Sequence, residues 1–308
     1  MKTIAVHSDT FHADDALSIY FLRQTEEFKN ANYVRTRDPA IIEKCDAVCD
    51  VGGIYDHEKR RYDHHQKGFN VTFEDSKIKL SSCGLVYLNF GKEINTNILR
   101  NHGKDIGPHT DLLWKTMYRL FVKEIDAIDN GVSQFRPDAN VIFQINTNVS
   151  QRVAMLNSIG TFDEAIELIG KEFENRLLLF FESDIPAIEV AEKAFKSRFD
   201  VDPSGQLVLC EEKCSILRQI KDLELIEKPE KQILYIISYR EDGNWSIRGV
   251  SSVGFEVRKP LPFKGLRDEE LSQACGIPGG VFVHKNAFMA IFKTQEQAIQ
   301  FAKLALAQ

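Results

Sequence analysis

The sequence contains no apolar run that approaches the roughly 20 residues needed to cross a bilayer, so we expect no membrane-spanning helix. It also has no excess of positive charge, since 45 acidic residues outnumber 39 basic ones and the formal net charge is −6. This balance argues against a protein that coats DNA or binds membrane surfaces. A nucleic-acid substrate stays open, because a local basic patch or bound divalent ions can supply the attraction.

Neither the chain start nor the cysteines indicate export. Residues 1–7 enter a predicted strand at once and leave no room for a signal or transit peptide, so we expect a cytoplasmic protein. The six cysteines have neither the spacing of a disulfide framework nor that of a zinc ribbon. Two pairs, Cys45 with Cys49 and Cys210 with Cys214, could form weak metal sites. Reduced and mostly buried thiols are the favoured interpretation.

The length and the hydrophobic patterns indicate two domains. At 308 residues the chain is long for one domain and sufficient for two. Strands alternating with helical patterns predict an α/β domain over residues 1–199, with a mainly parallel sheet flanked by helices. Its last part, residues 161–199, predicts a helical connector with a break at Pro186.

Residues 200–205, rich in Asp, Pro and Gly, are the best linker candidate. Beyond them the pattern changes, and we expect a smaller α+β domain over residues 205–308. It consists of predicted strands at 206–210, 232–238 and 244–250 and a closing helix at 295–306.

Histidine and aspartate gather in the first 65 residues, which contain five of the eight histidines. The densest stretch is Asp63-His64-His65. His7 and Asp50 each follow a predicted strand. Because ligands of parallel sheets bind at the carboxyl ends of the strands, we expect these side chains to meet. So many metal-binding side chains in so short a stretch predict a metal centre.

The candidate ligands are imidazoles and carboxylates without cysteine, a set that suits Mn²⁺ or Mg²⁺ better than structural zinc. They are His7, His12, Asp14, Asp50, His64 and Asp126. Six ligands are enough for two ions, with Asp50 as the candidate bridging carboxylate. Two ions about 3.5–4 Å apart can stabilise the attacking and leaving oxygens of a phosphoryl displacement. The predicted reaction is therefore metal-dependent hydrolysis of a phosphoester or phosphoanhydride.

Three residues of this group are candidates for a catalytic role. Asp50 would act through the ions. His65, beside a ligand, would contact the phosphate or donate a proton. Asp63 would orient a ligand histidine through a hydrogen bond.

Basic and hydroxyl side chains are candidates for substrate binding. They are Arg35, Arg37, Ser81, Ser82, Arg248, Arg258, Lys259 and His284. The first two arginines could equally be solvated surface charge, and the two serines could cap the helix that they precede. The four residues after the linker could be ordinary surface, but together they are typical of an anion-binding face.

Asp63-His64-His65, with an upstream aspartate pair and an aspartate at a strand end, resembles the DHH phosphoesterase superfamily. Longer segments resemble one branch, the Myg family (melanocyte proliferating gene homologues). They are residues 10–17 (TFHADDAL), 34–38 (VRTRD), 50–53 (DVGG), 61–66 (RYDHHQ), 79–82 (KLSS), 126–131 (DAIDNG), 258–262 (RKPLP) and 265–272 (GLRDEELS). These segments run from the first predicted strand almost to the last helix, so the resemblance covers nearly the whole chain.

The resemblance implies a two-domain DHH-type phosphoesterase fold with the active site in the cleft between the domains. It implies a metal-dependent 3′→5′ exonuclease whose partner is RNA or a short oligonucleotide. In the wider superfamily, basic residues of the second domain hold the substrate phosphate, which fits Arg258 and Lys259.

The first motif departs from the superfamily pattern. Phe11 stands four residues after His7, where the superfamily has aspartate, and the acids are the adjacent Asp14 and Asp15. Which of the two binds metal stays open. The fourth motif is matched loosely, so the choice between Asp126 and Asp129 stays open as well.

Two other functions compete with the exonuclease. One is a metal-dependent phosphatase or pyrophosphatase that acts on a small phosphorylated molecule. The other is a non-catalytic module that binds a metal or a nucleotide. The sequence leaves the oligomeric state open, and a homodimer is possible.

Overall fold

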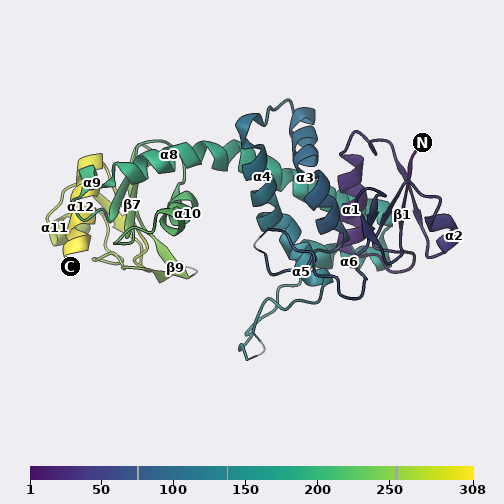
Figure 1. The fold of residues 1–308 in the computed structure, drawn as a ribbon. Coiled ribbons are helices and arrows are strands. Elements are labelled where there is room, and N and C mark those ends of the chain that lie inside the picture. The colour runs from purple at the N-terminus through teal and green to yellow at the C-terminus, as the bar shows by residue number, and fades with distance from the viewer. Residues whose placement is uncertain (75, 137, 254–255) are drawn as a thin grey trace. The chain divides into compact units, whose positions relative to one another are not determined.

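The computed structural model describes residues 1–74, 76–136, 138–253 and 256–308. It divides into two compact units, Met1–Leu179 (unit 1) and Phe180–Gln308 (unit 2). Each unit combines a five-stranded sheet with helices (Figure 1), which confirms the predicted mixed α/β architecture. Among the described residues, no helix is long and apolar enough to cross a membrane.

Unit 1 alternates strands and helices before it becomes helical. Its elements are β1 (Thr3–Val6), α1 (Ala13–Arg23), β2 (Asn32–Arg35), α2 (Pro39–Ile42), β3 (Ala47–Cys49), β4 (Tyr55–Asp56), β5 (Arg61–Tyr62), α3 (Ser82–Asn101), the 3₁₀ turn η1 (Gly107–His109), α4 (Thr110–Met117), the π turn η2 (Tyr118–Val122), α5 (Lys123–Asp129), α6 (Val149–Ile159) and α7 (Phe162–Leu179). The strand order is β2-β1-β3-β5-β4, and all neighbours are parallel except β4 and β5. The carboxyl ends of β1, β3 and β5 therefore lie at one edge of the sheet.

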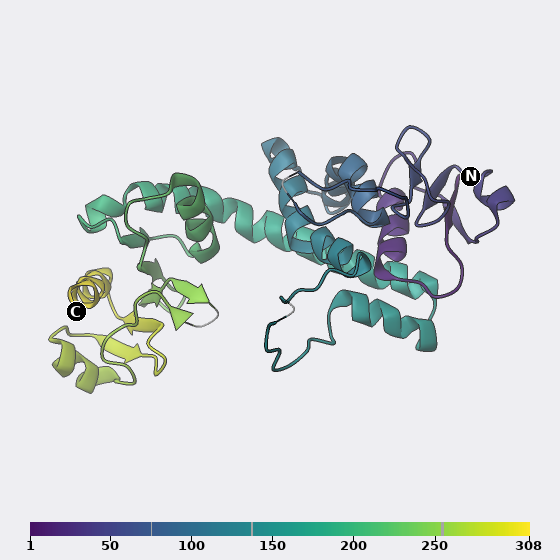
Figure 2. The same cartoon turned by 60° about the horizontal axis from the view of Figure 1, so that its bottom comes forward.

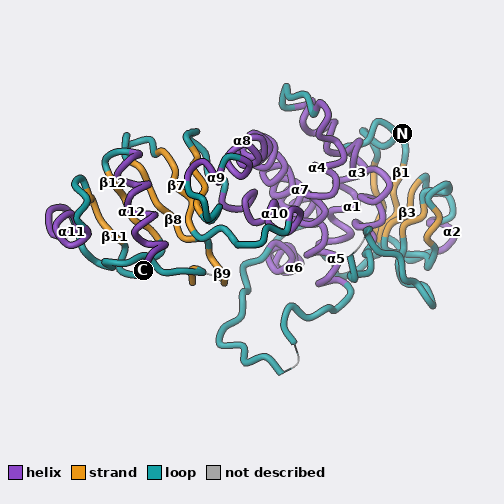
Figure 3. The backbone as a smooth tube through the Cα atoms, turned by 60° about the vertical axis from the view of Figure 1, so that its left-hand side comes forward, coloured by secondary structure: helices purple, strands orange, loops and turns teal. Residues whose placement is uncertain are grey.

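Helices cover both faces of this sheet. On one face, Ile42 of α2 packs with Ala5, Val48 and Val51. In Figure 3, β1 and β3 lie between α2 and the helices α1 and α3. Helix α1 also packs on α7, where Gly170 leaves room for an aromatic ring of α1 that a Cβ would displace.

A long segment joins α5 to α6. Its described residues, 130–136 and 138–148, are in neither helix nor strand (Figure 2). Asn148 ends the segment and caps α6, since its side chain accepts a hydrogen bond from the backbone of Gln151. The cap fixes the first turn of α6 at the place where that helix meets the site described below.

Unit 2 is built around a mostly antiparallel sheet. Its elements are the π turn η3 (Phe180–Asp184), α8 (Ile185–Lys196), α9 (Arg198–Val201), β6 (Leu207–Cys210), α10 (Leu217–Glu227), β7 (Tyr235–Tyr239), β8 (Trp245–Gly249), β9 (Ser251–Val253), β10 (Glu256–Val257), α11 (Asp268–Cys275), β11 (Gly280–Val283), β12 (Met289–Phe292) and α12 (Gln295–Ala307). The sheet order is β11-β12-β8-β7-β6, with only the β6–β7 pair parallel among these strands. Along β6, Leu207 packs with Phe301 of α12, whereas Val208 packs with Ala191 of α8. This alternation buries both faces of the sheet.

The boundary between the two units lies earlier in the chain than the linker that the sequence predicts. Unit 2 begins at Phe180, because Ala187 and Ala191 of α8 pack with Val208 in one hydrophobic cluster. Pro186, the predicted break, stands in the first turn of α8, directly after the π turn. Because residues 162–184 are already helical, the missing N–H of Pro186 falls within a continuous helical path, just after its π turn.

Candidate metal centre

Three parallel strands bring the predicted cluster together. His7 directly follows β1, Asp50 directly follows β3, and Asp63 directly follows β5. Because these strands are neighbours and parallel, the three residues lie at the same edge of the sheet. All three are almost fully buried.

Asp50 is the centre of the cluster. Its Oδ2 lies 3.3 Å from Nε2 of His7, and its Oδ1 lies 3.4 Å from Nε2 of His64 and 3.4 Å from Nδ1 of His65. The φ of Asp50 is 55°, a left-handed conformation that non-glycine residues adopt rarely and that aspartate tolerates better than most. Two carboxylate oxygens that face different imidazoles are what a bridging carboxylate requires.

The helices α1 and α5 add candidate ligands from the other side. His12 precedes α1, Asp14 lies in its first turn, and Asp129 is the last residue of α5. Ligand atoms of these three residues lie within 4.8 Å of one another. Asp129 Oδ2 also lies 3.1 Å from Nε2 of His64, which joins this group to the strand residues.

The two adjacent acids of α1 have different surroundings. Asp15 Oδ1 accepts a hydrogen bond from the backbone of His12, and its Oδ2 lies 2.9 Å from Nε2 of His7. Asp14 instead lines the cavity. The geometry therefore favours Asp14 as the ligand and gives Asp15 the task of capping α1 and holding His7.

The predicted ligand Asp126 points away from the cavity. It is fully buried, and its Oδ1 accepts hydrogen bonds from the backbone and the hydroxyl of Ser81, both at 2.9 Å. A Cβ on Gly84 would collide with this carboxylate, so the glycine permits the contact. Asp126 thus ties α5 to the start of α3, and Asp129, one turn later, is the residue of this pair that lines the cavity.

Asp63 fixes His65 rather than His64. Its Oδ1 lies 2.8 Å from Nδ1 of His65 and accepts the His65 backbone N–H at 3.0 Å. Its Oδ2 accepts the backbone N–H of Gly53 at 2.6 Å. The His65 side chain is 65% exposed, so its Nε2 remains accessible to a substrate.

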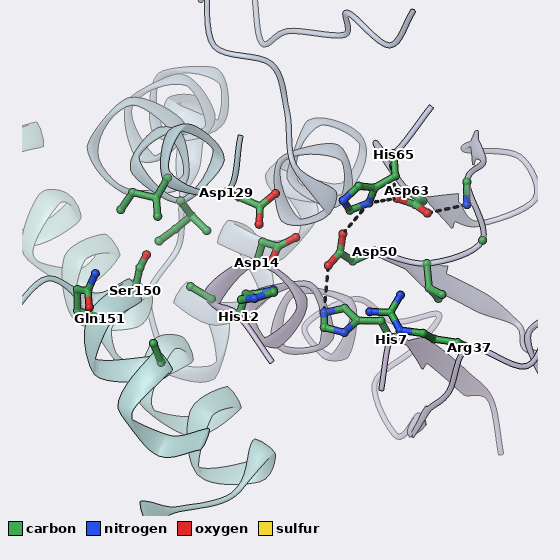
Figure 4. Close-up of a pocket in the computed structure, with 17 residues that line it drawn as sticks. His7, His12, Asp14, Arg37, Asp50, Asp63, His65, Asp129, Ser150 and Gln151 are labelled. Atoms are coloured by element: carbon green, nitrogen blue, oxygen red, sulfur yellow. Dashed lines mark hydrogen bonds and ion pairs between the residues drawn. The ribbon is translucent and has the colours of Figure 1, made fainter. Parts of the chain in front are cut away.

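Most residues of the cluster line one cavity of about 680 Å³, whereas His64 joins them through its contacts with Asp50 and Asp129. The cluster residues that line it are His7, His12, Asp14, Asp50, Asp63, His65 and Asp129. Figure 4 shows Asp14, Asp50, Asp129 and the histidines His7, His12 and His65 pointing into it. Arg37 lies at its edge and is more than half exposed, 3.6 Å from Asp9. The cavity is of the size that small-molecule and cofactor sites occupy.

Mutual contacts shift the pKa values of the cluster strongly. Contacts with Asp15 and Asp50 raise the pKa of His7 to about 10. Burial would lower the pKa of His64, but contacts with Asp129 and Asp50 outweigh it and raise the value to about 10. Burial would raise the pKa of Asp50, but His64 and His7 lower it to about 2. Protons on the histidines thus compensate the buried carboxylates.

A divalent cation fits this cluster. Several buried polar atoms have no hydrogen bond within the described part of the chain: His7 Nε2, both carboxylate oxygens of Asp14, Asp15 Oδ2, Asp50 Oδ1 and His64 Nε2. Some of them lie at ion-pair distances from one another, but without the geometry of a hydrogen bond. Burial, together with nearby Asp50 and Asp129, raises the pKa of Asp14 well above its usual value. Carboxylate and imidazole donors left unpaired around one space are the ligands of a hard or borderline divalent ion.

Three of the predicted substrate-binding residues in unit 1 make other contacts. Arg35 lies between the rings of Phe11 and Phe162, 5.3 and 4.9 Å from their centroids. Ser81 and Ser82 are fully buried, and the Ser82 hydroxyl donates to the backbone oxygen of residue 62. Arg37 is the member of this group that lines the cavity.

The predicted basic face of unit 2 is only partly accessible. Arg258 pairs with Glu224 at 2.8 Å, and Lys259 donates to the backbone oxygen of residue 306. His284 Nδ1 accepts a hydrogen bond from the backbone of residue 286. Arg248 is exposed at the edge of a second cavity, of about 500 Å³.

Sequence reasoning missed one wall of the cavity. The first turns of α6 contribute Ser150, Gln151 and Ala154. No signal in the sequence marks them, because polar residues at the start of an amphipathic helix are typical of solvent-facing positions.

The fold is mixed α/β, and one edge of its sheet gathers buried aspartates and histidines around a cavity. These features define the class of this protein: an α/β protein with a candidate divalent-metal centre. Residues 3–306 match the model of the MYG1_exonuc family, described as an uncharacterised protein family (UPF0160). The chain is 39% identical to human (Homo sapiens) "MYG1 exonuclease", with 99% of this chain and 86% of that protein aligned. It is 39% identical to "MYG1 protein C27H6.8" of Caenorhabditis elegans (98% and 94% aligned) and 36% identical to "MYG1 protein YER156C" of Saccharomyces cerevisiae (99% and 96%).

The chain therefore belongs to the MYG1 family, and the Myg resemblance found in the sequence is confirmed.

Proposed function

We propose that this protein is a divalent-metal-dependent phosphodiesterase of the DHH superfamily that acts as a 3′→5′ exonuclease on RNA. The observation that carries the proposal is Asp50, a buried carboxylate with three histidines within 3.4 Å and unpaired carboxylates beside it. The name "MYG1 exonuclease", given to the human and bovine relatives, supports a nucleic-acid substrate. The Asp63-His64-His65 sequence supports the superfamily.

Two ions, Mn²⁺ or Mg²⁺, would be held by the residues around the cavity. The ligands would be His7, His12, Asp14, Asp50, His64 and, in place of Asp126, Asp129. Asp50 would be shared between the two ions. When bound, such ions supply electrophilic stabilisation of the scissile phosphate and a nucleophile at neutral pH.

The side chains that are not ligands orient the substrate and move a proton. Arg37, at the edge of the cavity, would bind a phosphate oxygen. Asp63 accepts the Nδ1 proton of His65, which leaves Nε2 to contact the phosphate or to protonate the leaving oxygen. In unit 2, Arg248 is the accessible candidate for a further phosphate, whereas Arg258 already pairs with Glu224.

The test is digestion of single-stranded RNA labelled at its 5′ end, with added Mn²⁺. We expect progressive shortening from the 3′ end with release of nucleoside monophosphates, and complete loss of this activity in Asp50→Asn. The matched control is Asp111→Asn, which changes a carboxylate that is 73% exposed on α4 and should leave the activity unchanged. Intact RNA and DNA with the wild-type protein would contradict the proposal. Faster hydrolysis of pyrophosphate or a nucleotide would instead support a small-molecule phosphatase.

A further inference from the structure

One wall of the cavity differs chemically from the rest. It is formed by the first turns of α6, with Ser150, Gln151 and Ala154. In Figure 4, Ser150 and Gln151 lie on the far side of Asp14 from Asp50. A group that extends past Asp14 from a phosphate at the cluster would meet this wall.

Ser150 and Gln151 have hydrogen-bonding capacity to spare. The Ser150 hydroxyl oxygen is buried and has no partner among the described residues. The Gln151 backbone N–H donates to Asn148, whereas no hydrogen bond of its side-chain amide is found in the described part of the chain. Leaving a buried hydroxyl unpaired is costly, so a ligand that pairs with it gains affinity.

The uncharged hydrogen-bonding groups of these two side chains indicate which part of a substrate they would bind. Apart from the histidines, they are the uncharged hydrogen-bonding side chains among the described residues that line the cavity. Phosphate oxygens would be attracted by ions and by Arg37, and a neutral hydroxyl or amide adds little there. The Ser150 hydroxyl and the Gln151 amide both suit a sugar hydroxyl, which donates one hydrogen bond and accepts others. Ile125 and Ile128, on the same cavity, offer apolar surface for the sugar carbons.

We propose that Ser150 and Gln151 bind the 2′-hydroxyl of the 3′-terminal ribose and set a preference for RNA over DNA. The inference rests on the proposed exonuclease function. The terminal ribose is adjacent to the scissile phosphate, so with the phosphate at the cluster it would lie within the same cavity as this wall. A site that hydrogen-bonds a substrate hydroxyl rejects an analogue that lacks it, because its own polar groups are then left unpaired.

The test compares two single-stranded RNAs that differ only in the sugar of the 3′-terminal nucleotide, ribose or 2′-deoxyribose. We expect the wild-type kcat/KM for release of that nucleotide to be about tenfold or more higher with ribose. In Ser150→Ala and Gln151→Ala the ribose substrate should slow toward the deoxyribose one, by about tenfold for each substitution. Hydrolysis of bis(p-nitrophenyl) phosphate, which has no sugar, should keep its wild-type kcat/KM.

Two control variants change the same residue types outside the cavity: Ser158→Ala on α6 and Gln144→Ala in the preceding segment, both exposed. They should retain the ribose preference. Equal losses on both RNAs in the Ser150 and Gln151 variants, or no loss on either, would overturn the inference while leaving the exonuclease intact. A wild-type protein that degrades no oligonucleotide would remove the proposed function and this inference with it.

Discussion

The side-chain amide of Asn157 forms two hydrogen bonds with the backbone of Phe11. The Phe11 N–H donates to Oδ1 at 2.9 Å, and Nδ2 donates to the Phe11 carbonyl at 2.8 Å. The amide of this α6 residue thus pairs with the loop between β1 and α1 as a neighbouring strand would. Because Phe11 directly precedes His12, the contact fixes the approach of a candidate ligand. Arg35, stacked on the Phe11 ring, holds the loop from another side.

Asn157→Ala should weaken metal binding more than it weakens the fold. The two hydrogen bonds are partly exposed, so their loss should lower the free energy of unfolding by about 1–2 kcal/mol. Loss of a group that orients a ligand typically costs about 10- to 100-fold in metal affinity. Calorimetric titration with Mn²⁺ and urea unfolding of the metal-free protein measure the two effects. Asn157→Asp, which keeps the acceptor and loses the donor, should be intermediate, and Ser158→Ala should behave as wild type. Unchanged Mn²⁺ affinity in Asn157→Ala would show that His12 needs no such support.

The convergence of the cluster could be predicted from the sequence because it follows from a general rule. His7 and Asp50 each stand at the end of a predicted strand, and parallel strands present their carboxyl ends at one edge. The short strand β5, which places Asp63 at the same edge, was not predicted. The roles of individual acids could not be assigned in this way. Asp126 and Asp129 lie one helical turn apart, and what separates them is the packing of α5 on α3, where Gly84 makes room for Asp126.

The sequence also could not show which side chains pair with partners that are distant along the chain. Arg258 is a plausible phosphate ligand until Glu224, 34 residues earlier, is found beside it. A basic residue is free to bind a substrate only if the fold supplies no internal acid, and periodicity says nothing about that. The wall formed by Ser150 and Gln151 was missed because the sequence does not show that the start of α6 lies at the cluster.

The geometry predicts that Asp129, not Asp126, is a metal ligand. Asp129→Asn should lower Mn²⁺ affinity by at least about tenfold with little change in stability, because its side chain lies at the cavity and is partly exposed. Asp126→Ala should instead lower the free energy of unfolding by about 1–3 kcal/mol, since it leaves the buried donors of Ser81 unpaired. Urea unfolding and Mn²⁺ titration of both variants separate the two effects. Retained Mn²⁺ affinity in Asp129→Asn, with loss in Asp126→Asn, would restore the assignment predicted from the sequence.

Metal affinity should rise with pH. In the metal-free protein, His7 and His64 have a pKa of about 10, so both carry protons at neutral pH. An imidazole must be neutral to bind a metal, so each of these histidines must release its proton. The apparent Mn²⁺ affinity should therefore increase by up to about 100-fold per pH unit between pH 6.5 and 8.5. Titration calorimetry in buffers of different ionisation enthalpy counts the released protons directly, and a value near zero would contradict the prediction.

The stability of the metal-free protein should depend on pH in the opposite sense. Because the pKa of His7 and of His64 is higher in the folded state than the usual 6.5, protonation favours folding. Their contribution is complete below pH 6.5 and is lost as the pH rises through about 10. Urea midpoints measured from pH 6.5 to 9.5 should fall without metal. With saturating Mn²⁺ this fall should be reduced, since bound metal stabilises the folded state more as its affinity rises.

Asp63 and His65 should act as one unit, because Asp63 accepts the Nδ1 proton of His65 and thereby selects which nitrogen faces the substrate. Asp63→Asn can offer its amide N–H to Nδ1, which favours the other tautomer, and should lower kcat for RNA. His65→Gln should lower kcat by a similar factor, typically about 10²- to 10⁴-fold for a lost proton donor. If the two residues serve the same step, the double variant should be hardly worse than either single one. Mn²⁺ affinity should stay near the wild-type value in His65→Gln, which separates this role from that of a ligand. Additive losses in kcat would show that Asp63 acts independently of His65.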